Sequence, residues 1–266
     1  NSVGDVMEII YLIFFFLLGL AMGSFFCVVG LRLAREENFV AGRSYCDSCH
    51  HELVAKDLVP LISYIFLKGR CRYCKSKINP LSFFIELFTG ILFMVAFYSF
   101  SFSIDLLIVL ASISLTMIIF ASDSTYLIIP DEVLIFFSLL FIVLDIIKLG
   151  YIGTLKMIVG AVFLFLVMYA LMKFGDFLLK KESLGGGDVK LLFVIGLILE
   201  PLLGIVNIFL GSFIALPVSI FLYKKNKEHV IPFGPFLLVA FLIILFSKVS
   251  QSDIINIILN LSWYIK

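Results

Sequence analysis

Four cysteines in this sequence have the spacing of a metal site. Cys46-x2-Cys49 and Cys71-x2-Cys74 form two pairs separated by 21 residues, and four thiolates at such spacing can close a tetrahedron around zinc. A shell of four cysteines leaves no open coordination position, so we expect a structural rather than a catalytic zinc. Two disulfides are the alternative, which the reducing cytoplasm disfavours for a segment placed there.

Other potential metal ligands lie close to these pairs. His50 and His51 follow the first pair, and we interpret them as a solvated turn because the cysteines already complete the shell. Cys27 lies in an apolar run and is most simply a small packing residue. The predicted ligands are therefore the four paired cysteines alone.

Aspartates form a second group of candidate residues, in two stretches that border apolar runs. Asp123 ends one run, Asp131 opens the next, and Asp188 follows three glycines. A helix N-cap would explain Asp131 and Asp188 but not Asp123. Two carboxylates that face each other share a proton, so that one can activate water while the other polarises a peptide carbonyl, as in aspartic proteases. From spacing alone, ion-coupling carboxylates are an equal alternative.

The composition places these groups in a membrane protein. Of the 266 residues, 62% are hydrophobic and 15% are charged, which excludes an ordinary soluble domain. Several apolar runs are long enough to cross a hydrocarbon core of roughly 30 Å. We therefore predict an all-α polytopic membrane protein with about eight transmembrane helices and a small cytoplasmic four-cysteine zinc-binding insertion. The expected spans are 6–29, 82–100, 104–122, 132–149, 152–174, 188–203, 204–223 and 233–247.

Two of these boundaries have alternatives. A single kinked helix over 188–223 would replace the expected break at Pro201 and Gly204 and would reverse the final spans. The first span resembles a signal peptide only faintly, because Asp5 and Glu8 precede its apolar core where a signal peptide would be basic. We expect that span to be retained.

The basic residues set the expected orientation. Nine of the twenty Lys and Arg lie between Arg32 and Lys77, so the positive-inside rule places that segment in the cytoplasm. With eight alternating spans, sixteen of the twenty fall on the same side. This topology puts Asp123, Asp131 and Asp188 together at the cytoplasmic face.

Four parts are expected along the chain. They are a first transmembrane helix at 1–29, a cytoplasmic zinc-binding domain at 30–81, a membrane bundle carrying the aspartates at 82–250, and a C-terminal interfacial helix at 251–266. The zinc-binding part is too small to bury much core, so a metal would supply folding energy. The last part carries polar residues at helical spacing among Ile and Leu, which suits a helix in the outer interface.

The motifs occur in the order found in a known family. The chain resembles the type IV prepilin peptidases, membrane aspartic proteases of the Gly-x-Gly-Asp class. The resemblance covers most of the chain and rests on Gly23-Ser24-Phe25, Arg32-Leu33, the two cysteine pairs, Asp57-Leu58-Val59-Pro60, Ser63-Tyr64, Gly69-Arg70-Cys71-Arg72-Tyr73-Cys74, Glu86-Leu87, the stretch from Asp123 to Asp131 and the stretch from Gly185 to Leu191.

The resemblance implies an activity and a set of site residues. It makes Asp123 and Asp188 the catalytic pair. Supporting roles fall to Asp131, Gly185, Gly187 and Lys190. The substrates would be prepilins or prepseudopilins, whose basic leader is cut at the cytoplasmic face of the bacterial inner membrane. Zinc would be the structural cofactor and membrane lipid the surroundings, with no nucleic acid as a partner.

Many members of that family also methylate the newly exposed N-terminus with S-adenosylmethionine. The resemblance associates Glu86 with this second activity. Two departures bear on it, because Cys27 stands where Asn is usual and Leu81-Ser82-Phe83 stand where Arg-Tyr-Pro is usual. No glycine-rich nucleotide loop on a strand is visible in the sequence either. Whether methylation is retained or lost stays open.

Two other classes of protein are alternatives. A proton-coupled membrane transporter with a structural zinc domain would also carry acids near helix ends, but its site would usually lie near the bilayer midplane between repeated halves. A zinc-bearing scaffold protein would explain the cysteines and leave both aspartate stretches unused.

Overall fold

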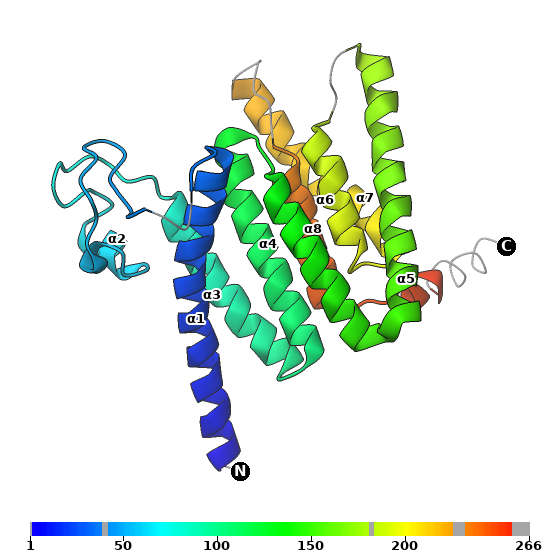
Figure 1. Ribbon diagram of the computed structural model, residues 1–266, viewed down its shortest axis with the longest axis horizontal. Helices are drawn as coiled ribbons and strands as arrows, with labels where there is room; N and C mark the ends of the chain where they lie inside the picture. The colour runs from blue at the N-terminus through cyan, green and yellow to red at the C-terminus, as the bar shows by residue number, and fades with distance from the viewer. Residues whose placement is uncertain (1, 39–41, 181–183, 226–231, 257–266) are drawn as a thin grey trace. The chain divides into compact units, whose positions relative to one another are not determined.

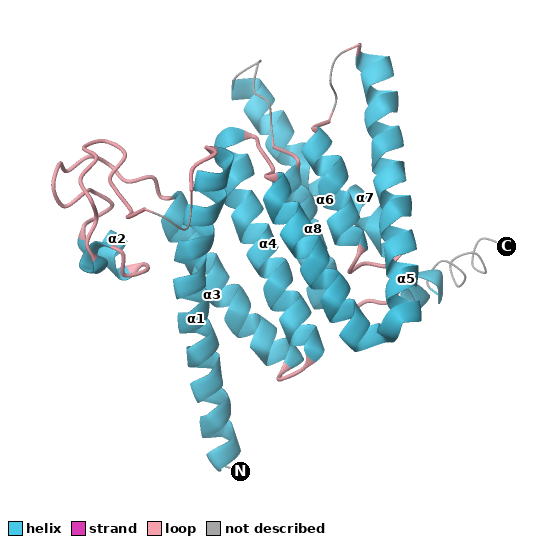
Figure 2. Ribbon diagram, in the orientation of Figure 1, coloured by secondary structure: helices cyan, strands magenta, loops and turns pink. Residues whose placement is uncertain are grey.

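The computed structural model consists of helices, turns and loops in the residues that it describes (Figures 1 and 2). It describes the chain except residues 1, 39–41, 181–183, 226–231 and 257–266. The elements are α1 (Ser2–Ala34), the 3-10 turn η1 (Ala55–Asp57), α2 (Ile62–Phe66), α3 (Leu81–Phe100), α4 (Ile104–Tyr126), α5 (Asp131–Leu179), α6 (Gly186–Gly196), α7 (Pro201–Lys225) and α8 (Gly234–Ser247).

Five of these helices are long and apolar enough to cross a membrane, namely α1, α3, α4, α5 and α7. α5 contains 49 residues and is interrupted at Gly150, whose φ of 70° is not helical. At that residue its two arms, 131–149 and 151–179, fold back on each other (Figure 1). Glycine reaches positive φ without the steric penalty that other residues have. The predicted class, an all-helical multi-pass membrane protein, is confirmed.

The predicted count of eight spans is not confirmed. α6 has 11 residues and α8 has 14, so at a rise of about 1.5 Å per residue they are only about 16 and 21 Å long. The span expected at 188–203 is instead the short helix α6, followed by a turn and by α7 from Pro201. The first residues of that turn, Leu197 to Leu199, are apolar and only Glu200 is charged, so hydropathy does not show that α6 already ends at Gly196. A single kinked helix over 188–223 is also not observed.

The chain divides into two compact units, residues 1–126 and 127–266, and each is described by itself. In the first unit, α1 packs against α3 and α4. A Cβ atom at Gly23 would lie 2.8 Å from the Cα atom of Glu86, and one at Gly30 would lie 2.4 Å from the carbonyl oxygen of Ile118. These glycines let the backbones of neighbouring membrane helices approach closely.

In the second unit, α6 packs against α5, and α7 packs against α8. A Cβ atom at Gly196 would lie 2.7 Å from the Cα atom of Ala161 in the second arm of α5. α6 is therefore seated directly on that arm. Of the interfacial helix expected at 251–266, residues 251–256 are helical, and residues 257–266 lie outside the described part of the chain.

Candidate functional site

The four paired cysteines lie together in the first unit. Their sulfur atoms all lie within 4.8 Å of one another, and the Sγ atoms of Cys46 and Cys74 are 3.8 Å apart. A Zn–S bond of about 2.3 Å places the sulfurs of a tetrahedral site about 3.8 Å apart. The cluster can therefore hold a metal ion, and four thiolates are a donor set that zinc prefers.

Each cysteine pair lies in its own tight turn, and the two turns have the same hydrogen-bond pattern. The backbone N–H of His50 donates to the carbonyl oxygen of Cys46 at 2.8 Å, and that of Lys75 donates to the carbonyl oxygen of Cys71 at 3.1 Å. His50 and Lys75 both have positive φ, at 55° and 60°, and an isolated β-bridge closes each turn. The two turns thus repeat one backbone conformation, although their sequences share little beyond the cysteines.

Hydrogen bonds lower the pKa of two of the thiols, Cys46 and Cys74, whereas desolvation and the neighbouring thiols raise the pKa of Cys49 to about 11. Burial alone would raise the pKa of Cys46, but hydrogen bonds from the backbone of Cys49 and Ser48 lower that pKa to about 6. Thiolates are the form that binds metal. All the cysteines are free thiols, so the disulfide alternative is not realised. Among the described residues the cluster contains cysteines alone, and the ring of His51 instead lies 3.6 Å from that of Tyr73.

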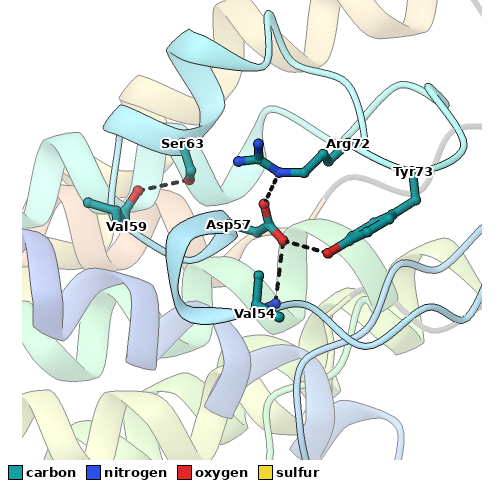
Figure 3. A network of polar contacts seen from close by, with 6 residues as sticks. All are labelled: Val54, Asp57, Val59, Ser63, Arg72 and Tyr73. Carbon is teal, nitrogen blue, oxygen red and sulfur yellow. Dashed lines mark hydrogen bonds and ion pairs between the residues drawn. The ribbon is translucent and has the colours of Figure 1, made fainter.

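Asp57 fixes the second cysteine pair. Its carboxylate is only 2% exposed and accepts hydrogen bonds from Arg72 Nε at 2.5 Å and from the Tyr73 hydroxyl and the Val54 N–H at 3.4 Å each (Figure 3). Arg72 and Tyr73 are the two residues between Cys71 and Cys74. Burial opposes ionisation, yet these donors hold the pKa of Asp57 below its usual range. Asp57 was not among the candidate residues expected from the sequence, although its place between the cysteine pairs was a signal.

Arg35 joins the cysteine segment to α4. Its Nε donates to the hydroxyl of Tyr126, and its guanidinium also lies 3.6 Å from the carboxylate of Asp47. Asp47 directly follows Cys46, and Tyr126 is the last residue of α4, three positions after Asp123. A contact between side chains 91 positions apart carries no local sequence signal and is not predictable from the sequence.

Asp123 and Asp188, the predicted catalytic pair, are both buried near helix ends. Asp123 is 5% exposed and lies in the last turn of α4, which continues beyond the expected end at residue 122. Asp188 is 7% exposed and lies in the first turn of α6. The two residues belong to different units, so their pairing stays a prediction.

Neither Asp131 nor Asp188 is a helix N-cap, so the simpler explanation for these residues is wrong. The N-cap of α5 is Pro130, and that of α6 is Gly185. The N–H of Asp188 donates to the carbonyl oxygen of Gly185 at 3.1 Å. Because another residue caps each helix, the capping preference of aspartate does not account for these two positions.

Asp131 and Lys190 form an ion pair in the second unit. The Nζ of Lys190 donates to both carboxylate oxygens of Asp131, at 2.7 and 2.8 Å. The pair borders an otherwise mostly apolar groove of about 700 Å³ lined by both arms of α5 and by α6. At about 100° per residue, Asp188 and Lys190 point about 200° apart around α6. The ion pair therefore lies on the side of α6 opposite to Asp188.

The glycine-rich turn packs against the segment that precedes α5. A Cβ atom at Gly187 would lie 3.1 Å from the Cβ atom of Ile129, whereas one at Gly186 would meet nothing within 4 Å. Gly187 thus brings the two aspartate stretches into contact within the second unit. This packing is a sufficient reason for a glycine at position 187.

Glu86, the residue associated with methylation, is buried in α3. Its Oε2 accepts a hydrogen bond of 2.8 Å from the N–H of Leu61, which precedes α2. Glu86 thereby ties the cysteine segment to a membrane helix. Cys27 is buried in α1, as expected of a packing residue.

Two buried polar side chains of the second unit were not among the sequence candidates. Asp145 lies in the first arm of α5 and Asn207 in α7. Within the described residues, Oδ2 of Asp145 and both side-chain polar atoms of Asn207 have no hydrogen-bond partner. A carboxylate inside a membrane helix is costly and usually functional, and the charge of Asp145 within the run at 132–149 was the available signal.

Comparison with known proteins supplies the family. Residues 17–100 match the family described as Bacterial Peptidase A24 N-terminal domain, and residues 108–220 match the Type IV leader peptidase family. A prepilin leader peptidase/N-methyltransferase of Bacillus subtilis (strain 168) is 31% identical over 229 residues, which are 83% of this chain and 88% of that protein.

Two further relatives carry the same name. The protein of Klebsiella pneumoniae is 36% identical over 192 residues, covering 69% of this chain and 82% of its own length. The protein of Vibrio cholerae serotype O1 is 28% identical over 255 residues, which are 91% of this chain and 98% of that protein. No solved structure matches the chain.

Proposed function

Because the chain belongs to the type IV leader peptidase family, we propose that it cleaves the basic leader peptide from type IV prepilins or prepseudopilins by aspartic-protease chemistry. The catalytic pair is Asp123 and Asp188. The observation that carries this assignment is the burial of both carboxylates near helix ends, in the two stretches that resemble the family motifs. The comparisons give no support to a proton-coupled transporter.

The two carboxylates have complementary roles in the reaction. Buried carboxylates that face each other cannot both ionise readily, so the pair holds one proton. The ionised carboxylate takes a proton from water, whose oxygen attacks the scissile carbonyl carbon. The protonated carboxyl donates its proton to the carbonyl oxygen. When the tetrahedral intermediate collapses, the carboxyl that took the proton from water gives it to the leaving amine, and a hydroxyl of the intermediate returns a proton to the other carboxylate. Water is consumed, and both carboxyl groups return to their starting state.

Asp131 and Lys190 support this pair without entering the chemistry. Their ion pair, at 2.7 and 2.8 Å, connects the start of α5 to the second turn of α6. Removing either charge would free the other and loosen the attachment of α6, which carries Asp188. Gly185, as the N-cap, and Gly187, in contact with Ile129, set the path of the chain into that helix.

The protein is a multi-pass protein of the inner membrane, and the cysteine cluster and the aspartates face the cytoplasm. The concentration of basic residues between Arg32 and Lys77 supports this orientation. The cluster holds one structural zinc ion, because four thiolates leave no position for water or substrate. Lipid surrounds the helices, and no nucleic acid takes part.

N-methylation of the new N-terminus, with S-adenosylmethionine as methyl donor, is the second activity. The relatives that match over most of the chain are named for both activities. Mass spectrometry of the mature pilin N-terminus tests it, since methylation adds one methyl group. A product that is cleaved but unmethylated would show that the protein lacks the methylation activity, in line with its unusual residues at Cys27 and 81–83.

Conservative substitution tests the catalytic pair. Asp123→Asn and Asp188→Asn keep the side-chain shape and remove the carboxylate, so we expect each to lower prepilin cleavage by about 100-fold or more. Leader loss would be followed on gels with purified protein in detergent. Asp105→Asn, in the first turn of α4, is the matched control and should cleave normally. Near wild-type cleavage by either catalytic variant would overturn the assignment.

A further inference from the structure

The short helix α2 carries an apolar face that nothing in the described chain covers. Ile62, Ile65 and Phe66 are 54%, 61% and 82% exposed. Their spacing places them on one side of a helix, and the exposed side chains of Leu58 and Val59 precede them. A contiguous apolar patch on a polar segment marks a surface that binds something.

α2 is attached to the start of α3 at its N-terminal end and through Tyr64, which lies about 200° around the helix from Ile62 and Phe66. The N–H of Leu61 donates to the buried carboxylate of Glu86 at 2.8 Å, and the ring centroids of Tyr64 and Phe83 are 5.1 Å apart. Both contacts lie in the first two turns of α3, which begins at Leu81. These two contacts fix both the position and the rotation of α2.

This attachment sets the depth of α2 relative to the membrane. α3 has 20 residues and is therefore about 30 Å long, the thickness of a hydrocarbon core. Its first two turns must then lie where the hydrocarbon meets the lipid headgroups. Phe84, in the same two turns, and Phe88, at the start of the next, are exposed, so the lipid-facing side chains of α3 begin at the level where α2 is attached.

The surrounding charges match a membrane surface. Between Leu58 and Lys77 the sequence contains five basic residues and no acidic residue. Lys68, exposed just after α2, can extend along apolar surface and place its ammonium among headgroups. Basic side chains beside an inserted apolar face are typical of interfacial segments that bind anionic lipids.

We propose that the face formed by Leu58, Val59, Ile62, Ile65 and Phe66 inserts into the headgroup region of the leaflet from which α3 starts. The lipid surface thereby holds the cysteine segment against the membrane. Lipid fits this face better than a protein partner does, because the depth set by Glu86 and the basic surroundings both match a bilayer interface.

Depth-dependent fluorescence quenching tests the proposal. Phe66→Trp would be made in a chain carrying Trp263→Phe, since Trp263 is the single tryptophan, and reconstituted in vesicles of phosphatidylglycerol with phosphatidylcholine brominated at carbons 6 and 7. Phe84→Trp marks lipid contact, and Tyr45→Trp marks the cysteine segment away from α2. Unchanged metal content and prepilin cleavage would verify that each variant is folded.

We expect Phe66→Trp to be quenched within about twofold of Phe84→Trp, and Tyr45→Trp to be unaffected by bromine. Quenching of Phe66→Trp no greater than that of Tyr45→Trp would overturn the proposal. Two other outcomes would overturn the proposal as well. If the emission of Phe66→Trp changes with the protein-to-lipid ratio but not with bromine, the face binds a second copy of the chain. If this emission changes only when prepilin is added, the face binds the substrate.

Discussion

Replacing Asp57 with alanine should weaken zinc binding, because Asp57 clamps the turn that carries Cys71 and Cys74. Its carboxylate is 2% exposed and is held by Arg72 Nε at 2.5 Å, with two longer hydrogen bonds of 3.4 Å. A hydrogen bond to a charged group contributes about 1.5–3 kcal/mol, whereas bonds of 3.4 Å add little. Arg72 is 38% exposed, so water can partly replace the lost carboxylate. The net loss is about 2 kcal/mol.

That loss should be measurable as a loss of metal affinity. If the cysteine segment folds around its metal, contacts present only in the folded segment contribute to the binding free energy. Since about 1.4 kcal/mol is a factor of ten, Asp57→Ala should raise the zinc Kd about 30-fold. The measurement is competition with a chromogenic chelator, using protein purified in detergent.

Glu52→Gln is the matched control for Asp57→Ala. It removes the ion pair between Glu52 and Arg43 in the same segment, whose side chains are both exposed. Exposed pairs contribute little to stability, so the zinc Kd should change by less than about threefold. If Asp57→Ala binds zinc as tightly as Glu52→Gln, the clamp does not stabilise the site and the reasoning is refuted.

Two further variants test the metal cluster and the glycine-rich turn. Elemental analysis should find about one zinc per chain, lost in Cys71→Ser and kept in Cys27→Ser; zinc retained by Cys71→Ser would exclude the four-cysteine site. Gly187→Val should destabilise the protein by about 1–3 kcal/mol, because its Cβ atom would lie 3.1 Å from that of Ile129, while Gly186→Val, in open space, should cost less. Thermal unfolding in detergent measures the stability of the two glycine variants. Equal decreases in their unfolding temperatures would contradict the packing role of Gly187.

The cysteine cluster was predictable because its determinants are local. Each pair occupies one turn, so the spacing of Cys46 and Cys49 already fixes how their side chains are presented. The membrane class was predictable for a similar reason, since apolarity and helix length are properties of single segments. Burial of Asp123 and Asp188 near helix ends likewise follows from their places at the borders of apolar runs.

The helix count and the supporting contacts were not predictable from the sequence. α6 ends at Gly196, but the sequence stays apolar as far as Leu199 and only then reaches Glu200 and Pro201, so its hydropathy does not show where α6 ends. The hydrogen bond between Leu61 and Glu86 joins residues 25 positions apart. Its partner at Leu61 is a backbone N–H, which every residue except proline carries, so no residue type marks it.

Asp131 and Asp188 show how position on a helix separates two carboxylates that look alike in the sequence. Each lies in the first turn of its helix, and each belongs to a motif. Lys190 donates to both oxygens of Asp131, so this carboxylate is engaged in holding α6 to the start of α5. Lys190 lies about 200° around α6 from Asp188, so its charge is directed away from that carboxylate. A proton-sharing role is therefore open to Asp188, while Asp131 is suited to hold the helix in place.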